Sequence, residues 1–113
     1  MSEAAIDLPT FEALQQTAGA DFVDELIDTF LAEAPLMHAD LRSSLAAHDA
    51  DRFRRAAHSL KSNSNTFGAL ALGKLAKALE LGGVAAVGNA QALDALDAEY
   101  ARVATALKAL RDA

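Results

Sequence analysis

Cysteine is absent from this 113-residue chain, proline occurs only twice, and aromatic residues make up only 5% of it. Without cysteine, neither disulfide bonds nor thiolate-ligated metal sites can form. No apolar run approaches the roughly 18 residues of a membrane span. The first residues, MSEAAIDL, are acidic and unlike a signal peptide. We therefore expect a cytoplasmic protein that does not associate with a membrane.

The residues that are abundant favour helices. Hydrophobic residues make up 52% of the chain, and alanine and leucine dominate them. With so few aromatic residues, this composition favours an all-α bundle over a β-sandwich or an α/β fold. The length suffices for a single modest core. We expect a flexible N-terminal tail over residues 1–7 and one helical domain over residues 8–113.

Helical periodicity and capping residues divide the domain into one short helix and five longer ones. Pro35 is expected to end one helix and begin the next, because a helix interior does not tolerate its missing donor and its ring. Asp21, Asp49 and Asn89 are expected to be N-caps. The expected helices cover residues 9 to about 18, 21–34, 35–48, 49–65, 69–81 and 89–110. An antiparallel four-helix bundle with short accessory N-terminal helices follows.

The last expected helix carries an apolar seam with alternating spacings of three and four residues. Its members are Leu93, Leu96, Tyr100, Val103, Leu107 and Leu110. Such a seam could pack inside the bundle or form a coiled-coil dimer. About three heptads with small alanines between them favour the intramolecular arrangement, so we expect a monomer.

Charge is unevenly distributed along the chain. The net charge of −6 argues against general nucleic-acid binding. Residues 52–79 nevertheless contain six basic residues and no acidic one, whereas the remainder contains four basic and sixteen acidic residues. A basic segment in an acidic protein suggests attraction to a local anion, such as a phosphoryl group or an acidic pocket on a partner.

The functional interpretation depends on His58. Helical spacing predicts a buried stripe around it that consists of Phe53, Ala57, Leu60, Ser64 and Phe67. His58 lies roughly 130° round the helix from that stripe, so we expect it to face water or a partner. Arg54 and Lys61 share its side of the helix, and Arg55 lies close to it. Ser62, one turn on, is small enough to let a large partner approach the imidazole.

An imidazole in such a setting can accept a transferable group. Histidine can form covalent intermediates, and its pKa near neutrality leaves one ring nitrogen free to attack at physiological pH. Phosphoryl transfer requires mainly in-line positioning and charge compensation from the protein. His58 with its cationic neighbours is therefore a candidate phosphohistidine.

The stretch AAHSLKSNSNTFGALALGKLAKALE resembles the central motif of the histidine phosphotransfer (HPt) domains of bacterial multistep phosphorelays. That motif is commonly A-H-x-L-K-G, a later glycine, and a leucine-patterned helix that ends in L-E. The matching residues are Ala57, His58, Leu60, Lys61, Gly68, Leu75, Leu79 and Glu80. Ser62 departs from the motif, which usually has glycine there, and its hydroxymethyl group occupies space where a receiver would dock.

The resemblance implies that His58 accepts a phosphoryl group from a phosphoaspartate of a receiver domain and passes it to another response regulator. The expected partners are response regulator receiver domains and a hybrid sensor histidine kinase. The receiver would supply Mg²⁺, so this chain would be a phosphoryl carrier without turnover or a cofactor of its own. Lys61, with Arg54 as a second candidate, would offset the charge of the phosphoryl group. The expected docking residues are Arg55, Ser62, Asn65 and Gly68.

The other two histidines carry no functional expectation. We expect His38 to be an exposed surface residue, and His48 suits the C-terminal end of its helix because of the helix dipole. The even spacing of ten residues between the three histidines does not match the i, i+4 geometry of a helical metal pair. No metal site is expected.

Three alternatives remain open. The first is an HPt-like module that docks on receivers or kinases without phosphorylation, against which the intact His58 and Lys61 speak. The second is the dimerisation helix pair of a sensor kinase. Such kinases usually have an acidic residue after the histidine, where this chain has Ser59, and they need an ATP-binding domain for which 113 residues leave no room. The third is an independent enzyme, but no carboxylate pair, nucleophile elbow or phosphate-binding loop is found.

Overall fold

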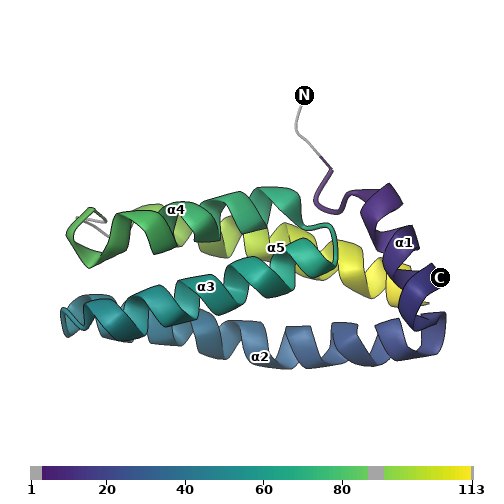
Figure 1. Ribbon diagram of the computed structural model, residues 1–113, viewed down its shortest axis with the longest axis horizontal. Helices are drawn as coiled ribbons and strands as arrows, with labels where there is room; N and C mark the ends of the chain where they lie inside the picture. Colours follow the sequence, from purple (N-terminus) through teal and green to yellow (C-terminus); the bar gives the residue numbers. More distant parts are fainter. Residues whose placement is uncertain (1–3, 87–90, 113) are drawn as a thin grey trace.

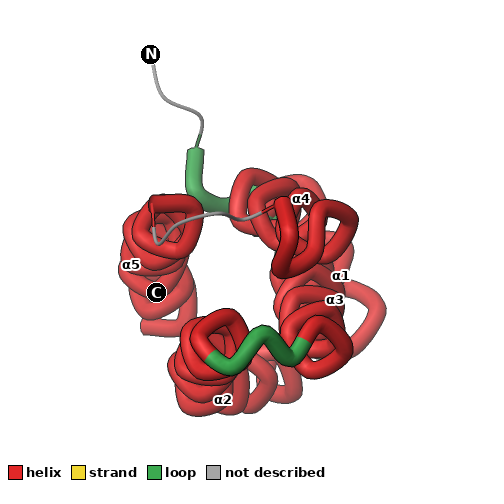
Figure 2. The backbone as a smooth tube through the Cα atoms, turned by 90° about the vertical axis from the view of Figure 1, so that its left-hand side faces the viewer, coloured by secondary structure: helices red, strands yellow, loops and turns green. Residues whose placement is uncertain are grey.

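The computed structural model describes residues 4–86 and 91–112. These residues form five α-helices and contain no strand: α1 (Leu8–Ala18), α2 (Ala20–Ala46), α3 (Ala50–Thr66), α4 (Leu70–Ala86) and α5 (Gln91–Asp112). Helices α2 to α5 run antiparallel to their neighbours, and α1 lies across one end of them (Figure 1). Seen along the bundle, the four long helices occupy the corners of a square (Figure 2). The expected all-α four-helix bundle with an accessory N-terminal helix is confirmed.

The core forms where one stripe of each helix faces the centre of the bundle. The stripe expected around His58 is buried as predicted, and it consists of Phe53, Ala57, Leu60, Ser64 and Phe67. The seam of α5 also faces inward, through Leu93, Leu96, Val103 and Leu107. Because α5 packs against α2 and α4, this seam is used within the bundle. None of the described helices is both long and apolar enough to cross a membrane.

Pro35 does not interrupt the second helix, so the described chain has five helices and not the six that the sequence predicts. Helix α2 continues through Pro35. The proline is exposed, so water can bind the carbonyl group of Leu31, which loses its helical partner. The buried stripe keeps its period across the proline, from Ala34 to His38. Burial of that stripe outweighs the local cost of the missing hydrogen bond.

Two of the three expected N-caps can be compared with the structure. The side chain of Asp49 accepts a hydrogen bond from Arg52 N at 3.2 Å, so it caps α3 as predicted. Asp21 is not a cap, because α2 begins one residue earlier, after Gly19. The third, Asn89, lies outside the described residues.

Helix α3 extends slightly beyond its expected end. Ser64 and Thr66, which favour turns, bond back to helix carbonyl groups, with Ser64 Oγ 2.6 Å from Leu60 O. These bonds let α3 continue to Thr66. The range of α4 continues to Ala86, but Gly83 is non-helical and kinks the chain there, so the regular helix ends close to its expected end.

Part of the segment expected to be a flexible tail packs on the bundle. Ile6 is buried in the core, and Asp7 N donates a hydrogen bond to Gly68 O at 2.8 Å. The carboxylate of Asp7 accepts hydrogen bonds from the backbone N–H and the hydroxyl group of Thr10. Asp7 is thereby the N-cap of α1. The packed domain therefore begins before Leu8.

His38 is buried and not exposed as the sequence predicts. Its side chain continues the buried stripe of α2 and retains only 9% exposure. The imidazole Nδ1 bonds to a carboxylate oxygen of Asp97 on α5, and the ring lies 5.0 Å from that of Tyr100. Arg42 reaches the same carboxylate and also Asp94, whose Oδ1 is 2.9 Å from Arg42 Nη2. These contacts join α2 to α5 beside the core.

His48 lies two residues beyond the last helical residue of α2. Its φ angle of 55° lies in the left-handed region, in the turn that leads to Asp49. His48 therefore lies just beyond the end of α2, whereas the sequence predicts it at the end of the helix itself.

We expect Gly68→Ala to destabilise the protein by about 3 kcal/mol. Gly68 has a φ angle of +84°, and a Cβ atom there would lie 2.8 Å from Asp7 O and 3.0 Å from Thr10 Cβ. Urea unfolding measures the loss. Gly19→Ala is the control, because Gly19 also has a positive φ angle but no heavy atom lies within 4 Å of the added carbon. An equal loss in both variants would show that the contact with Asp7 does not constrain Gly68.

We expect Asp97→Asn to lower the free energy of unfolding by about 1 kcal/mol at pH 7, a modest loss because the carboxylate is partly solvated. Burial raises the pKa of Asp97, but hydrogen bonds from Arg42 and His38 bring it below its usual value. The ionised form is therefore the stabilising one. Its contribution is present above the usual pKa of an aspartate and is lost as the pH falls through the lowered pKa.

Urea unfolding of wild type and Asp97→Asn at pH 7 and below pH 3 measures this effect, and the two proteins should converge at low pH. Asp94→Asn is the control, because Asp94 bonds to Arg42 alone among these groups and should cost less. A difference between wild type and Asp97→Asn that stays constant with pH would contradict the assignment.

Candidate functional site

His58 stands on the solvent-facing side of α3, as its helical position predicts. Its side chain is 58% exposed. The ring does not rotate freely, because Nδ1 lies 2.8 Å from Glu80 Oε2 on the neighbouring helix α4. Glu80 lies 22 positions after His58 in the sequence, and the segment between them includes the turn at Gly68, which brings the two antiparallel helices together (Figure 1). The imidazole is thus exposed yet oriented.

The charge of Glu80 determines which ring nitrogen is reactive. Hydrogen bonds from Lys61 and, second, from His58 lower the pKa of Glu80 below its usual value, so the carboxyl group is ionised at neutral pH. An ionised carboxylate can only accept hydrogen bonds. His58 Nδ1 therefore carries the hydrogen of the neutral ring, and Nε2 carries the free lone pair.

Lys61 meets the same carboxylate from the next turn of α3. Its Nζ lies 2.7 Å from Glu80 Oε1, so Glu80 bridges Lys61 and His58. Glu80 itself is only 17% exposed, which limits competition from water. Lys61 and Glu80 neutralise each other, and the ring is held by a pair with no net charge.

Sequence reasoning placed Glu80 in the motif but assigned it no role. Two features could have revealed it. Glu80 is the first acidic residue after the acid-free residues 52–79. A helical hairpin folded at Gly68 also places α4 opposite His58. The identity of the facing residue depends on the packing register of two helices, which periodicity alone does not give.

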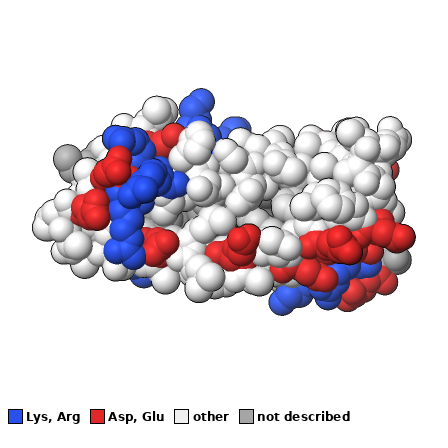
Figure 3. All heavy atoms as spheres, turned by 60° about the horizontal axis from the view of Figure 1, so that its bottom comes forward, with Lys and Arg blue, Asp and Glu red and all other residues white. Residues whose placement is uncertain are grey.

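The arginines near His58 are paired with acids that flank the basic segment. Arg54 Nη2 lies 2.8 Å and Arg55 Nε lies 3.4 Å from the carboxylate of Asp51. Arg52 pairs with Asp40 on α2 at 2.7 Å. Basic side chains accordingly gather with acidic ones at the end of the molecule where α2 ends and α3 begins (Figure 3). The structure pairs Arg54 with Asp51 and gives it no contact with His58.

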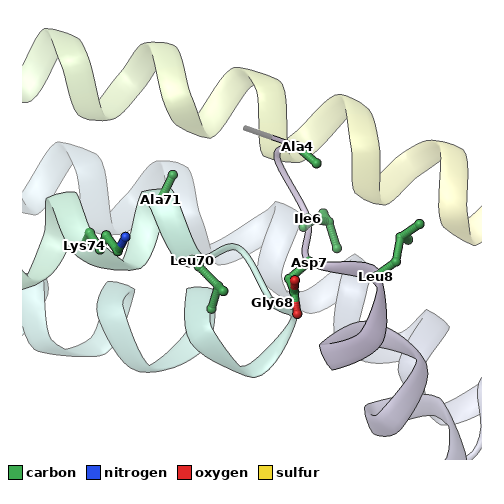
Figure 4. Close-up of a pocket in the computed structure, with 8 residues that line it drawn as sticks. All are labelled: Ala4, Ile6, Asp7, Leu8, Gly68, Leu70, Ala71 and Lys74. Atoms are coloured by element: carbon green, nitrogen blue, oxygen red, sulfur yellow. The ribbon is translucent and has the colours of Figure 1, made fainter. Parts of the chain in front are cut away.

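The expected docking residues fall into two groups. Arg55, Ser62 and Asn65 are exposed on α3. Asn65 lies over Gly73 of α4, where an added Cβ atom would be 2.9 Å from Asn65 Cγ. Gly68 is buried where the N-terminal segment crosses the turn, so it shapes the turn. Asp7 lies against it (Figure 4), and the assignment of Gly68 as a docking residue stays a prediction.

The three histidines lie in separate environments: the α2–α5 contact, the α2–α3 turn and the exposed face of α3. In residues 4–86 and 91–112, no three histidine, aspartate or glutamate side chains are grouped so that they could hold a metal ion. The site therefore consists of one exposed, oriented nucleophilic nitrogen with an ion pair behind it. No part of the described chain covers the ring, so a protein surface can reach it.

Comparisons with known proteins identify the family. A search among curated proteins found no match. Among solved structures, the crystal structure of histidine-containing phosphotransfer protein B (HptB) from Pseudomonas aeruginosa PAO1 is similar, with a TM-score of 0.88 and 27% sequence identity. The match covers 98% of this chain and 97% of that one. The family model of the Hpt domain matches residues 25–113. Because this match spans most of the sequence, the chain belongs to the Hpt family of histidine phosphotransfer proteins, the phosphoryl carriers of phosphorelays.

Proposed function

We propose that His58 accepts a phosphoryl group from the phosphoaspartate of a receiver domain and passes it to another response regulator. The observation that carries this proposal is the hydrogen bond between Nδ1 and Glu80, which leaves Nε2 unprotonated on an exposed ring. Family membership supports the phosphoryl group as the cargo, and the geometry supports His58 as the residue that bears it.

The transfer is a substitution at phosphorus. The Nε2 lone pair attacks the phosphorus atom, an N–P bond forms, and the P–O bond to the aspartate breaks. The electron pair of that bond returns to the aspartate, which leaves as a carboxylate. The imidazole gains positive charge as the N–P bond forms, and the carboxylate of Glu80 at Nδ1 stabilises this charge. Attack on phosphorus by the aspartate of a second receiver reverses these changes and restores His58.

Compensation of the phosphoryl charge, roughly −2, is the second requirement. Lys61 is held one turn from His58 through Glu80, and we assign it the first role in this compensation. Arg54 is four residues before His58 and exposed. It would serve as a second cation if its side chain left its ion pair with Asp51 and contacted the phosphoryl group. Both roles remain proposals that substitution of each side chain would test.

The remaining requirements fall to the partners. Receiver domains and kinases are the partners of Hpt proteins, and we propose a hybrid sensor histidine kinase as the source of the phosphoryl group. The receiver would bring Mg²⁺, and this chain would act in the cytoplasm as a monomeric carrier without turnover of its own. Arg55, Ser62 and Asn65 would contact the receiver.

We expect His58→Gln to abolish phosphorylation by phosphorylated receivers, because glutamine lacks the nucleophilic ring nitrogen. Radiolabelled receivers, each phosphorylated in advance, are mixed with either protein, and the label on the chain is followed with time. The label on wild type should be lost in acid and kept in base, as for a phosphoramidate. A chain that binds receivers but remains unlabelled would support the alternative of a docking module without phosphorylation.

We expect Glu80→Gln to slow transfer on the order of tenfold, because an amide can donate to Nδ1 and so favour the wrong tautomer of His58. Nitrogen NMR of the imidazole reports the tautomer directly, and rapid-mixing transfer assays report the rate. Glu99→Gln is the matched control, because Glu99 makes the corresponding ion pair with Arg102 on α5. An unchanged tautomer together with a slower rate would show that Glu80 acts in some way other than positioning the ring.

A further inference from the structure

The solvent-facing side of α4 carries an uninterrupted row of residues that the phosphotransfer step does not use. Its members, here called the α4 row, are Leu70, Lys74, Lys77, Ala78 and Leu81, spaced by four, three, one and three residues. All five are exposed. Leu70 is 42% and Leu81 is 76% exposed to solvent, so an exposed large apolar side chain lies at each end of the row. Two lysines lie between them.

The two lysines of the α4 row differ from most cations of the protein, and among the described residues only Lys108 on α5 shares their lack of an ion pair. Every arginine of the described residues forms an ion pair, and so does Lys61. Within the described ranges, no ion pair involves Lys74 or Lys77, and no acidic residue occurs in α4 before Glu80. Two of the three lysines without an ion pair in the described residues therefore lie on α4, whereas each arginine at the start of α3 contacts a carboxylate.

The α4 row adjoins the phosphoacceptor. Gly73 and Glu80 both face α3, one beneath Asn65 and the other against His58. Lys77 is four residues after Gly73 and three before Glu80, so it lies on the same flank of α4, between these two contacts. Leu81 directly follows Glu80. A surface that covers His58 Nε2 from the α4 side therefore meets Lys77 and Leu81.

At its other end the α4 row opens into a hollow of about 450 Å³. Leu70 and Lys74 of α4 line it together with Ile6 and Leu8 of the N-terminal segment (Figure 4). Its walls are mainly apolar; Lys74 contributes one cation and Asp7 one carboxylate, which accepts hydrogen bonds from Thr10. Such a hollow fits an apolar side chain.

We propose that the docking surface for the receiver domain extends from His58 along the α4 row to this hollow. This inference rests on the proposed function and adds the partner's contact surface to it. A receiver that holds Mg²⁺ beside its phosphoaspartate must carry carboxylates there, because oxygen ligands bind this ion. Carboxylates complement Lys74 and Lys77, and apolar side chains of the receiver complement Leu70 and Leu81. The lysines raise the rate of encounter, and the leucines supply apolar burial.

The test compares Lys77→Glu with Lys108→Glu, a matched charge reversal of an exposed lysine on α5. Transfer from a panel of purified receiver domains, phosphorylated with acetyl phosphate, is measured for both variants and wild type. Lys77→Glu should lower the second-order rate constant of transfer about tenfold at low ionic strength, with a smaller difference in high salt. Lys108→Glu should remain within about twofold of wild type. Leu81→Ser should weaken transfer at every salt concentration.

A second measurement separates docking from chemistry. Phosphoramidate, a small anionic donor, should phosphorylate His58 at the same rate in wild type and in Leu81→Ser, a substitution that removes the apolar contact without changing the charge. A slower reaction with phosphoramidate, equal effects of the two charge reversals, or a change of oligomeric state in Lys77→Glu would each overturn the docking surface proposed here. Failure of every receiver to label wild type would instead overturn the proposed function, and this surface with it.

Discussion

The carboxylate of Glu80 is the contact on which the site depends. It links two turns of α3 to α4 through Lys61 and His58, and it determines which imidazole nitrogen is free. The distance between the two helices must suit this bridge. Gly73 allows close approach beneath Asn65, and the left-handed Gly68 closes the hairpin that sets the register. The chemistry of His58 is thus a consequence of how α3 and α4 are joined.

Charge is arranged differently on the two sides of α3. Towards α2, the arginines are neutralised by Asp40 and Asp51 and hold the bundle end together. Along α4, Lys74 and Lys77 form no ion pair within the described residues and are exposed to an approaching partner. A basic segment of the sequence therefore serves two purposes. Its arginines mainly contribute local structure, where exposed ion pairs are weak, and its lysines supply the field that an approaching anion encounters.

Sequence reasoning succeeded where one helix decides the outcome. The buried stripe of α3, the cap at Asp49 and the exposure of His58 depend on spacing within a single helix, which periodicity describes well. It failed where neighbouring helices decide. Pro35 is tolerated because the rest of α2 is anchored on the core, and His38 is buried because α5 offers it Asp97. Rules for single helices and single histidines do not include the packing of α2 on the core or the contact between His38 and Asp97.

The same limit explains what was missed at the site. The motif gave His58 and Lys61, but the role of Glu80 and the burial of Gly68 depend on which residues of α4 and of the N-terminal segment lie opposite them. Arg54 was expected to turn towards His58 because both share a helix face. Asp51, one turn earlier, attracts it instead, a competition between neighbours that a charge count along the chain does not resolve.

The orientation of the imidazole has a consequence for reversibility. The hydrogen bond to Glu80 uses Nδ1, while cargo is loaded at Nε2, so the ring does not have to turn when it is charged or discharged. We expect the empty and the loaded carrier to share one shape and to differ chiefly in electrostatic potential. Little reorganisation on the carrier's side would lower the barrier equally for loading and unloading, and the relative stabilities of the two phosphoaspartates would then decide which way the phosphoryl group travels.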